Sequence, residues 1–189
     1  RDVFRVLKAR YGLEPDEDTL TREWIGHVLP RLAERIHPLP GVPEVLFELR
    51  RRGVTAARIL TPASFENAVR VLMALGGSTN GVLHLQAVAA ELGIDLTPET
   101  FDRLSAGTPL ICDLAPSGSR YMADLDEAGG VQAVMKELEP LLDTGALTVT
   151  GESLGDDLKT AMVRDRSVIR SLDDPISPEG GLRFLRGSL

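Results

Sequence analysis

The run Gly76-Gly77-Ser78-Thr79-Asn80 separates two segments that both have the apolar spacing of helices. Two adjacent glycines end a helix, because glycine enters left-handed backbone conformations without strain and has low helix propensity. Serine is a preferred N-cap residue, so Ser78 is expected to start the following helix. The stretch therefore predicts two helices joined by a short turn of small polar residues.

Helical periodicity extends on both sides of this turn. Apolar residues predict a helix over 64–75 with Ser64 as its N-cap, and a second helix to about Leu92, ended by Gly93. The predicted core includes the following residues: Val69, Leu72, Leu83, Leu85, Val88, Val134 and Leu138. These segments indicate a helical core on both sides of the break.

Three further helices are expected. One covers 44–52 after a Pro-rich joint, with Gly53 as its C-cap, and another begins at Thr97-Pro98-Glu99. A third runs over 131–142, with a kink near Pro140. Short apolar runs predict strands at 108–114, 147–150 and 167–170. The predicted fold class is α/β and mostly helical.

Composition limits the class of protein. Hydrophobic residues make up 43% and charged residues 26%, both in the globular range. The net charge of −7 argues against nucleic acid as a partner, and no stretch has the roughly 20 apolar residues of a membrane span. The single cysteine and the absence of a signal-like start favour a cytoplasmic protein.

A ligand-binding role and a purely structural role both fit the central stretch. Glycines let a ligand approach the backbone, and Ser78, Thr79 and Asn80 offer polar groups at a helix start that favours anions. Free N–H groups are expected at Asn80 and Gly81. A helix break followed by a cap explains the same residues, so physical chemistry alone leaves both readings open.

Other reactive residue types have simpler explanations. Cys112 lies in an apolar run and is expected to be buried, and Ser117 lies in a Pro-Ser-Gly turn with no local base. His84 is expected to be a partly buried helix residue. The acidic residues before Gly129 fit a solvated loop better than a Mg²⁺ site. No catalytic or metal-binding residue is predicted in this chain.

Longer motifs carry a family resemblance over about residues 54–189. They resemble the dihydroxy-acid dehydratase and phosphogluconate dehydratase family in the family's own order. The motifs are Ile59-Leu60-Thr61-Pro62-Ala63-Ser64-Phe65-Glu66-Asn67-Ala68, Met73-Ala74-Leu75-Gly76-Gly77-Ser78-Thr79-Asn80, Thr108-Pro109-Leu110, Pro116-Ser117-Gly118, Ala128-Gly129-Gly130-Val131, Leu147-Thr148-Val149-Thr150-Gly151 and Gly180-Gly181-Leu182. Residues 54–189 would then belong to the family's N-terminal α/β domain, truncated before its β-barrel domain.

The resemblance implies a hydro-lyase that converts 2,3-dihydroxy carboxylates to 2-keto acids, in branched-chain amino acid synthesis or sugar-acid catabolism. The full-length family uses an iron–sulfur cluster and Mg²⁺, binds a small dihydroxy acid and forms homodimers. By this resemblance Gly77, Ser78, Thr79 and Asn80 would face the substrate. The cluster cysteines and the candidate base serine have no counterpart in this sequence. We therefore expect the chain to hold no cofactor and to be inactive alone.

Residues 1–53 have a weaker resemblance to haloacid-dehalogenase-like phosphatases, through Leu39-Pro40-Gly41-Val42-Pro43 and the helix that follows it. The Asp-x-Asp motif of those phosphatases is not in the sequence. This resemblance predicts a helical N-terminal extension of separate origin. Two alternatives to a dehydratase fragment remain at this point, a phosphatase remnant and a non-catalytic α/β binding module.

Overall fold

The computed structural model describes Thr19, Arg22, Glu23, residues 25–27, Pro30, Arg31, residues 39–185 and Gly187. The chain forms two units, 1–48 and 49–189. Most of the helical extension predicted before residue 39 lies outside the described residues. The helix predicted over 44–52 is present as α3 (Val42–Arg51).

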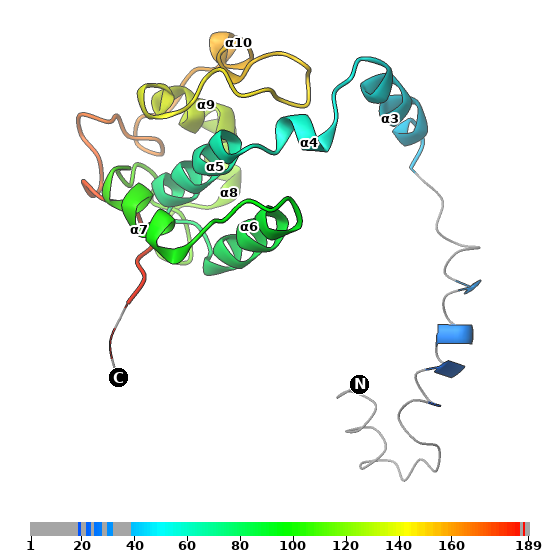
Figure 1. The fold of residues 1–189 in the computed structure, drawn as a ribbon. Helices are drawn as coiled ribbons and strands as arrows, with labels where there is room; N and C mark the ends of the chain where they lie inside the picture. Colours follow the sequence, from blue (N-terminus) through cyan, green and yellow to red (C-terminus); the bar gives the residue numbers. More distant parts are fainter. Residues whose placement is uncertain are drawn as a thin grey trace. The chain divides into compact units, whose positions relative to one another are not determined.

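The second unit is assembled around α5 (Pro62–Leu75) (Figure 1). This helix packs against α6 (Thr79–Glu91), α7 (Pro98–Ala106) and α9 (Gly130–Glu137). The shorter elements are α4 (Ala56–Ile59), α8 (Met122–Glu127), α10 (Leu154–Asp157) and the 3-10 turns η1 (Glu139–Leu141) and η2 (Leu158–Thr160). The prediction of a mostly helical fold is confirmed for this part of the chain.

Helix α5 begins earlier than its sequence pattern predicts. Thr61 is the N-cap, and its hydroxyl accepts the Ser64 N–H at 3.3 Å. The Ser64 hydroxyl accepts the Thr61 N–H at 2.9 Å, which completes a reciprocal capping pair. Pro62 fits the first helical position because it has no N–H to leave unbonded. Ser64 is therefore a capping partner inside the helix, and its prediction as the N-cap is wrong.

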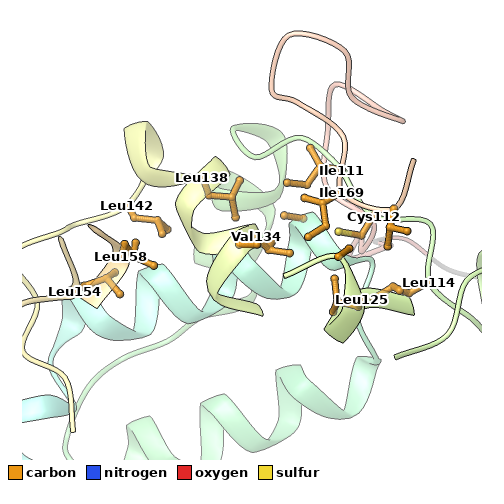
Figure 2. Packing of buried hydrophobic residues seen from close by; sticks show 14 residues of the cluster. Ile111, Cys112, Leu114, Leu125, Val134, Leu138, Leu142, Leu154, Leu158 and Ile169 are labelled. Carbon is orange, nitrogen blue, oxygen red and sulfur yellow. The ribbon is translucent and has the colours of Figure 1, made fainter. Parts of the chain in front are cut away.

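Two apolar clusters meet at α5. On one side, Val69 and Met73 are fully buried against residues of α6 and α7, among them Phe101. On the other side, Ala74 joins a cluster formed by 111–114, α8, α9 and the turn around Ile169 (Figure 2). Burying apolar surface is the main stabilising contribution to folding, so α5 links the two halves of the core.

Two residues of the predicted core are not in it. Leu83 and Val88 on α6 are 65% and 44% exposed, whereas Val69, Val134 and Leu138 are fully buried. The apolar pattern of α6 extends around the helix and so does not identify the side that packs inward.

The three predicted strands are present only as isolated bridges among the described residues. Leu110 pairs with Ser177, Cys112 with Ile169, and Leu147 with Ser153. The N–H groups of Ile111 and Cys112 both bond to the Ala74 carbonyl at the end of α5. They are therefore not available for the regular hydrogen bonds between two strands of a sheet. These predictions are wrong because the segments' backbone groups pair with helix ends and turns.

The helix predicted over 131–142 also ends early. α9 stops at Glu137, and Pro140 lies in η1, a separate 3-10 turn. Proline has no N–H to continue the helical ladder and clashes with the preceding turn. The α-helix therefore ends before Pro140 and a 3-10 turn follows it, where the sequence predicted a kink within one helix.

Asn67 joins α5 to a distant loop. Its side-chain amide donates to the Asp143 carbonyl at 2.8 Å, and its side-chain oxygen accepts the Asp143 N–H at 2.8 Å. Asn67 is 6% exposed, so water does not readily replace these bonds. The asparagine holds the loop after η1 against the middle of α5.

The substitution Asn67→Ala should lower the free energy of unfolding by about 1–2 kcal/mol, because it removes two partly buried hydrogen bonds to the Asp143 backbone. Urea unfolding followed by circular dichroism measures this change. The matched control Gln132→Ala, an exposed amide on α9, should change stability by less than about 0.5 kcal/mol. Equal effects of the two substitutions would contradict this role for Asn67.

Candidate functional site

The C-terminus of α5 is closed by Gly76. Its backbone is left-handed, with φ 60° and ψ 41°. The Gly77 N–H donates to the Leu72 carbonyl at 3.0 Å and the Gly76 N–H to the Met73 carbonyl at 3.2 Å. These two bonds form a Schellman motif, which favours glycine at the left-handed position. The predicted helix break is confirmed.

Gly77 has no room for a side chain. A Cβ atom there would lie 2.5 Å from Leu72 Cδ1 and 3.3 Å from the Leu72 carbonyl oxygen. Packing against the Leu72 side chain, which would have to move to admit a Cβ atom, therefore favours glycine at this position. The structure supplies this explanation independently of any ligand.

Ser78 begins α6 as predicted. Its hydroxyl accepts the Asn80 N–H at 3.2 Å, and its carbonyl accepts the Gly81 N–H at 2.9 Å. The expectation of free N–H groups at Asn80 and Gly81 is wrong, because the cap already uses both. As the first helical residue, Thr79 has no intrahelical acceptor for its own N–H. The side chains of Ser78, Thr79 and Asn80 are exposed.

Two other segments meet this turn. A Cβ atom on Gly76 would lie 3.1 Å from Leu110 Cδ1 and 3.7 Å from the Ser117 hydroxyl oxygen. A Cβ atom on Gly181 would lie 2.5 Å from the Gly76 Cα atom. The motifs at 76–80, 116–118 and 180–181, far apart in the sequence, therefore converge at the end of α5.

The segment around Ser117 is a turn, as the sequence predicts. The Ala115–Pro116 peptide bond is cis, the Gly118 N–H donates to the Leu114 carbonyl at 2.8 Å, and the Ser117 hydroxyl lies 3.3 Å from the same carbonyl. The Ser117 side chain is exposed beside Gly76. Sequence reasoning did not place Ser117 at the candidate site, although its Pro-Ser-Gly motif was already part of the family pattern.

The carboxylate of Asp113 stabilises the turn that contains Ser117. Asp113 accepts the Ser119 hydroxyl at 2.6 Å and the Ser119 N–H at 3.1 Å. The hydroxyl bond, and secondly the N–H bond, hold the pKa of Asp113 below its ordinary value. Asp113 is therefore charged at neutral pH and organises the turn that carries Ser117.

Metal binding is not supported by the described side chains. Cys112 is buried as predicted, and burial raises the pKa of its thiol to about 12; one thiol cannot by itself hold a cluster that needs several ligands. No group of three or more His, Cys, Asp and Glu side chains suited to a metal is found in the described part of the chain. These residues do not fit an iron–sulfur cluster or a Mg²⁺ site.

Thr79 lines a small cleft beside the helix start. The cleft has a volume of about 260 Å³ and is otherwise formed by Val82, Leu83, Leu182, Arg183 and Phe184. A second cleft of about 550 Å³ contains Arg166 and Arg170, but these pair with Glu137 and Asp174 at 2.6 Å. The polar start of α6 thus lies next to an apolar cleft. The two arginines of the larger cleft each pair with a carboxylate of this chain.

Two other predicted residues have ordinary roles. His84 is exposed on α6, so its predicted partial burial is wrong. Asp124 accepts the Tyr121 N–H at 2.6 Å, where α8 begins, and so has a structural role. No described helix is both long and apolar enough to cross a lipid bilayer.

Comparisons with known proteins agree with this arrangement of motifs. The family described as dihydroxy-acid/6-phosphogluconate dehydratase N-terminal matches residues 25–157. A dihydroxy-acid dehydratase of Ignicoccus hospitalis is 52% identical over 146 residues, which cover 76% of this chain and 26% of that protein. Dihydroxy-acid dehydratases of Methanothrix thermoacetophila and Acetivibrio thermocellus are 49% and 45% identical over 86% and 83% of this chain.

The helical fold, with three glycine-rich motifs gathered at the end of α5, is that of a dehydratase N-terminal region. The chain belongs to the dihydroxy-acid/6-phosphogluconate dehydratase family, a family of hydro-lyases. It spans 26–30% of the length of the three curated relatives named above. The family match begins at residue 25, inside the segment predicted to have a separate origin. The origin of residues 1–53 stays a prediction.

Two substitutions measure separately how much the packing of Gly77 and the capping by Ser78 contribute to stability. Gly77→Val should destabilise the protein by about 1–3 kcal/mol, because the added side chain overlaps Leu72. Ser78→Ala should cost about 1 kcal/mol through loss of the cap. Denaturant unfolding measures both values. Gly107→Ala is the control and should change stability by less than about 0.5 kcal/mol, since its Cβ would meet no atom closer than 3.7 Å. No loss of stability in Gly77→Val would refute the packing account.

The bonds from Ser119 should appear in the titration of Asp113. Because the folded pKa of Asp113 is lowered, its stabilising contribution is present above the ordinary value of 3.8 and is lost as the pH falls through the folded value. Ser119→Ala should move the pKa of Asp113 upward, toward that ordinary value. Carboxylate titration by nuclear magnetic resonance (NMR) measures the shift, and an unchanged pKa would show that Ser119 is not its cause.

Proposed function

We propose that this chain forms part of a hydro-lyase that dehydrates 2,3-dihydroxy carboxylates to 2-keto acids, and that it is inactive alone. The whole enzyme would be a cytoplasmic homodimer acting on a small dihydroxy acid. Its pathway would be branched-chain amino acid synthesis, with sugar-acid catabolism as the second candidate. The observation that carries the proposal is 45–52% identity to dihydroxy-acid dehydratases over at least 76% of the chain.

The exposed helix start supports a substrate-facing role for Gly77, Ser78, Thr79 and Asn80. Polar side chains elsewhere in the family motifs, such as Asn67 and Ser64, are bonded inside the protein. The hydroxyl of Thr79 and the amide of Asn80 instead lie at the surface, and the Ser78 hydroxyl is exposed although it caps α6. A carboxylate or hydroxyl group of the substrate could accept the Thr79 N–H at the positive end of α6. Ser117 would add a hydroxyl group from the neighbouring turn.

The catalytic groups would come from outside this chain. An iron–sulfur cluster, where present, would act as a Lewis acid on the departing hydroxyl group, in keeping with the family resemblance. Cys112 does not supply a ligand for it, because the thiol is buried and has a pKa of about 12. This chain would therefore contribute substrate contacts and the framework that positions them.

A chimera tests the proposal. The 146 residues of the Ignicoccus hospitalis dehydratase that match this chain are replaced by the corresponding residues of this chain. We expect the chimera to form 2-keto acid from 2,3-dihydroxyisovalerate and to prefer it to 6-phosphogluconate, while the chain alone gives no turnover. Keto-acid formation under anaerobic conditions is the measurement. Turnover by the chain alone, abolished by a point substitution in it, would contradict inactivity, and an inactive but folded chimera would contradict the assignment.

The role of the helix start is tested in the same chimera. Asn80→Ala should lower kcat/KM about tenfold or more if its amide bonds the charged substrate, since such a bond contributes about 1.5–3 kcal/mol. The matched amide substitution Gln132→Ala on α9 should leave kcat/KM within about twofold, because Gln132 is exposed away from the turn. Equal values for the two variants would remove Asn80 from the substrate site.

A further inference from the structure

Helix α6 is unusually poor in charged residues. Between Thr79 and Ala90 it has no Asp, Glu, Lys or Arg residue, and Glu91 ends it. The neighbouring helices differ, because α7 contains Glu99, Asp102 and Arg103. A helix face that remains in water normally contains charged side chains, and a helix that is apolar all round is normally covered on all sides.

Only one side of α6 is covered within the described unit. Val82 and Ala89 are 7% and 0% exposed and pack into the core. Leu83 is 65% exposed, and Ala87 and Ala90 are exposed at the following helical spacings. Residues at these spacings lie along one side of a helix. Leu83, Ala87 and Ala90 therefore form an outward apolar stripe, called here the α6 stripe.

The α6 stripe continues into the apolar cleft described above. Leu83 belongs to both, and Val82, Leu182 and Phe184 form most of the remaining wall. The cleft has a volume of about 260 Å³, enough for one or two large apolar side chains. Beyond it, the small side chains of Ala87 and Ala90 would let another backbone approach closely. Together they form a largely apolar surface with a hollow at one end, bordered by the exposed His84 and by Arg183.

We propose that the α6 stripe and this cleft are the docking surface for the rest of the dehydratase polypeptide. The chain corresponds to only 26–30% of the length of its curated relatives, so most of their sequence has no counterpart here. The occupant presents an uncharged apolar face, with a large side chain inserted beside Leu83. This inference rests on the proposed function, because it takes the chain as part of a longer hydro-lyase.

Cysteine accessibility tests the proposal. Leu83→Cys introduces an exposed thiol, while the natural Cys112 is 1% exposed and should not react. The rate of maleimide labelling at residue 83, measured by peptide mass spectrometry, is compared between the chain alone and the chimera described above. We expect the thiol to react at least about tenfold more slowly in the chimera, because burial restricts the reagent. If the chimera does not fold, the cysteine is placed at the aligned position of the Ignicoccus hospitalis enzyme.

Each outcome decides the proposal. Equal rates in the two proteins would overturn it, because the surface would then stay open in the whole enzyme. Protection that is lost when the whole enzyme dissociates into monomers would assign the surface to the second subunit and also overturn it. Protection in the chain alone that rises with concentration would assign it to a second copy of this chain, with the same consequence. A protected thiol in an inactive chimera would support the docking surface while contradicting the proposed function.

Discussion

The burial of α5 on two sides is the constraint on which the described structure depends. Val69 and Met73 pack into the cluster with α6 and α7, while Ala74 packs into the cluster with α8, α9 and the loops that follow. A charged side chain on either of these two buried sides would cost much free energy. Both sides of the helix must therefore stay covered by apolar neighbours. Its C-terminus therefore determines where Gly76 and the following turn lie.

Close packing of glycines forms the candidate site at the end of this framework. Gly181 approaches Gly76 so closely that a side chain on Gly181 would overlap the Gly76 Cα atom. The Asp113 carboxylate orders the turn that holds Ser117 beside the same glycine. Small residues bring three chain segments together, and their polar side chains remain at the surface. The site is thus a consequence of core packing at the end of one helix.

Sequence patterns predicted the longer helices and several of their ends, because caps and glycine stops act locally, but they did not predict the short helices α4, α8 and α10. Thr97 and Ser78 begin α7 and α6 as predicted, and Gly76 ends α5. The segment 147–150, predicted as a strand, forms a turn in which the Thr148 and Thr150 hydroxyls both bond to the Asp157 carboxylate. Such bonds between side chains leave no signal in the periodicity of apolar residues.

The candidate site was predictable in part for the same reason. Ser78, Thr79 and Asn80 were found from the helix signal and the family resemblance, and the structure places their side chains at the surface. The contacts of Gly76 with Ser117 and Gly181 depend on the tertiary fold and were not predicted. The free N–H groups were predicted at Asn80 and Gly81, but the Ser78 cap uses both.

The central claim is that the start of α6 contacts a dihydroxy carboxylate. Its most direct test is an NMR titration of the chain with 2,3-dihydroxyisovalerate, following each backbone amide. The account predicts saturable shifts that are largest at Ser78, Thr79 and Asn80. Saturable shifts that are largest at Arg166 and Arg170, or no saturable shift at the start of α6, would contradict it.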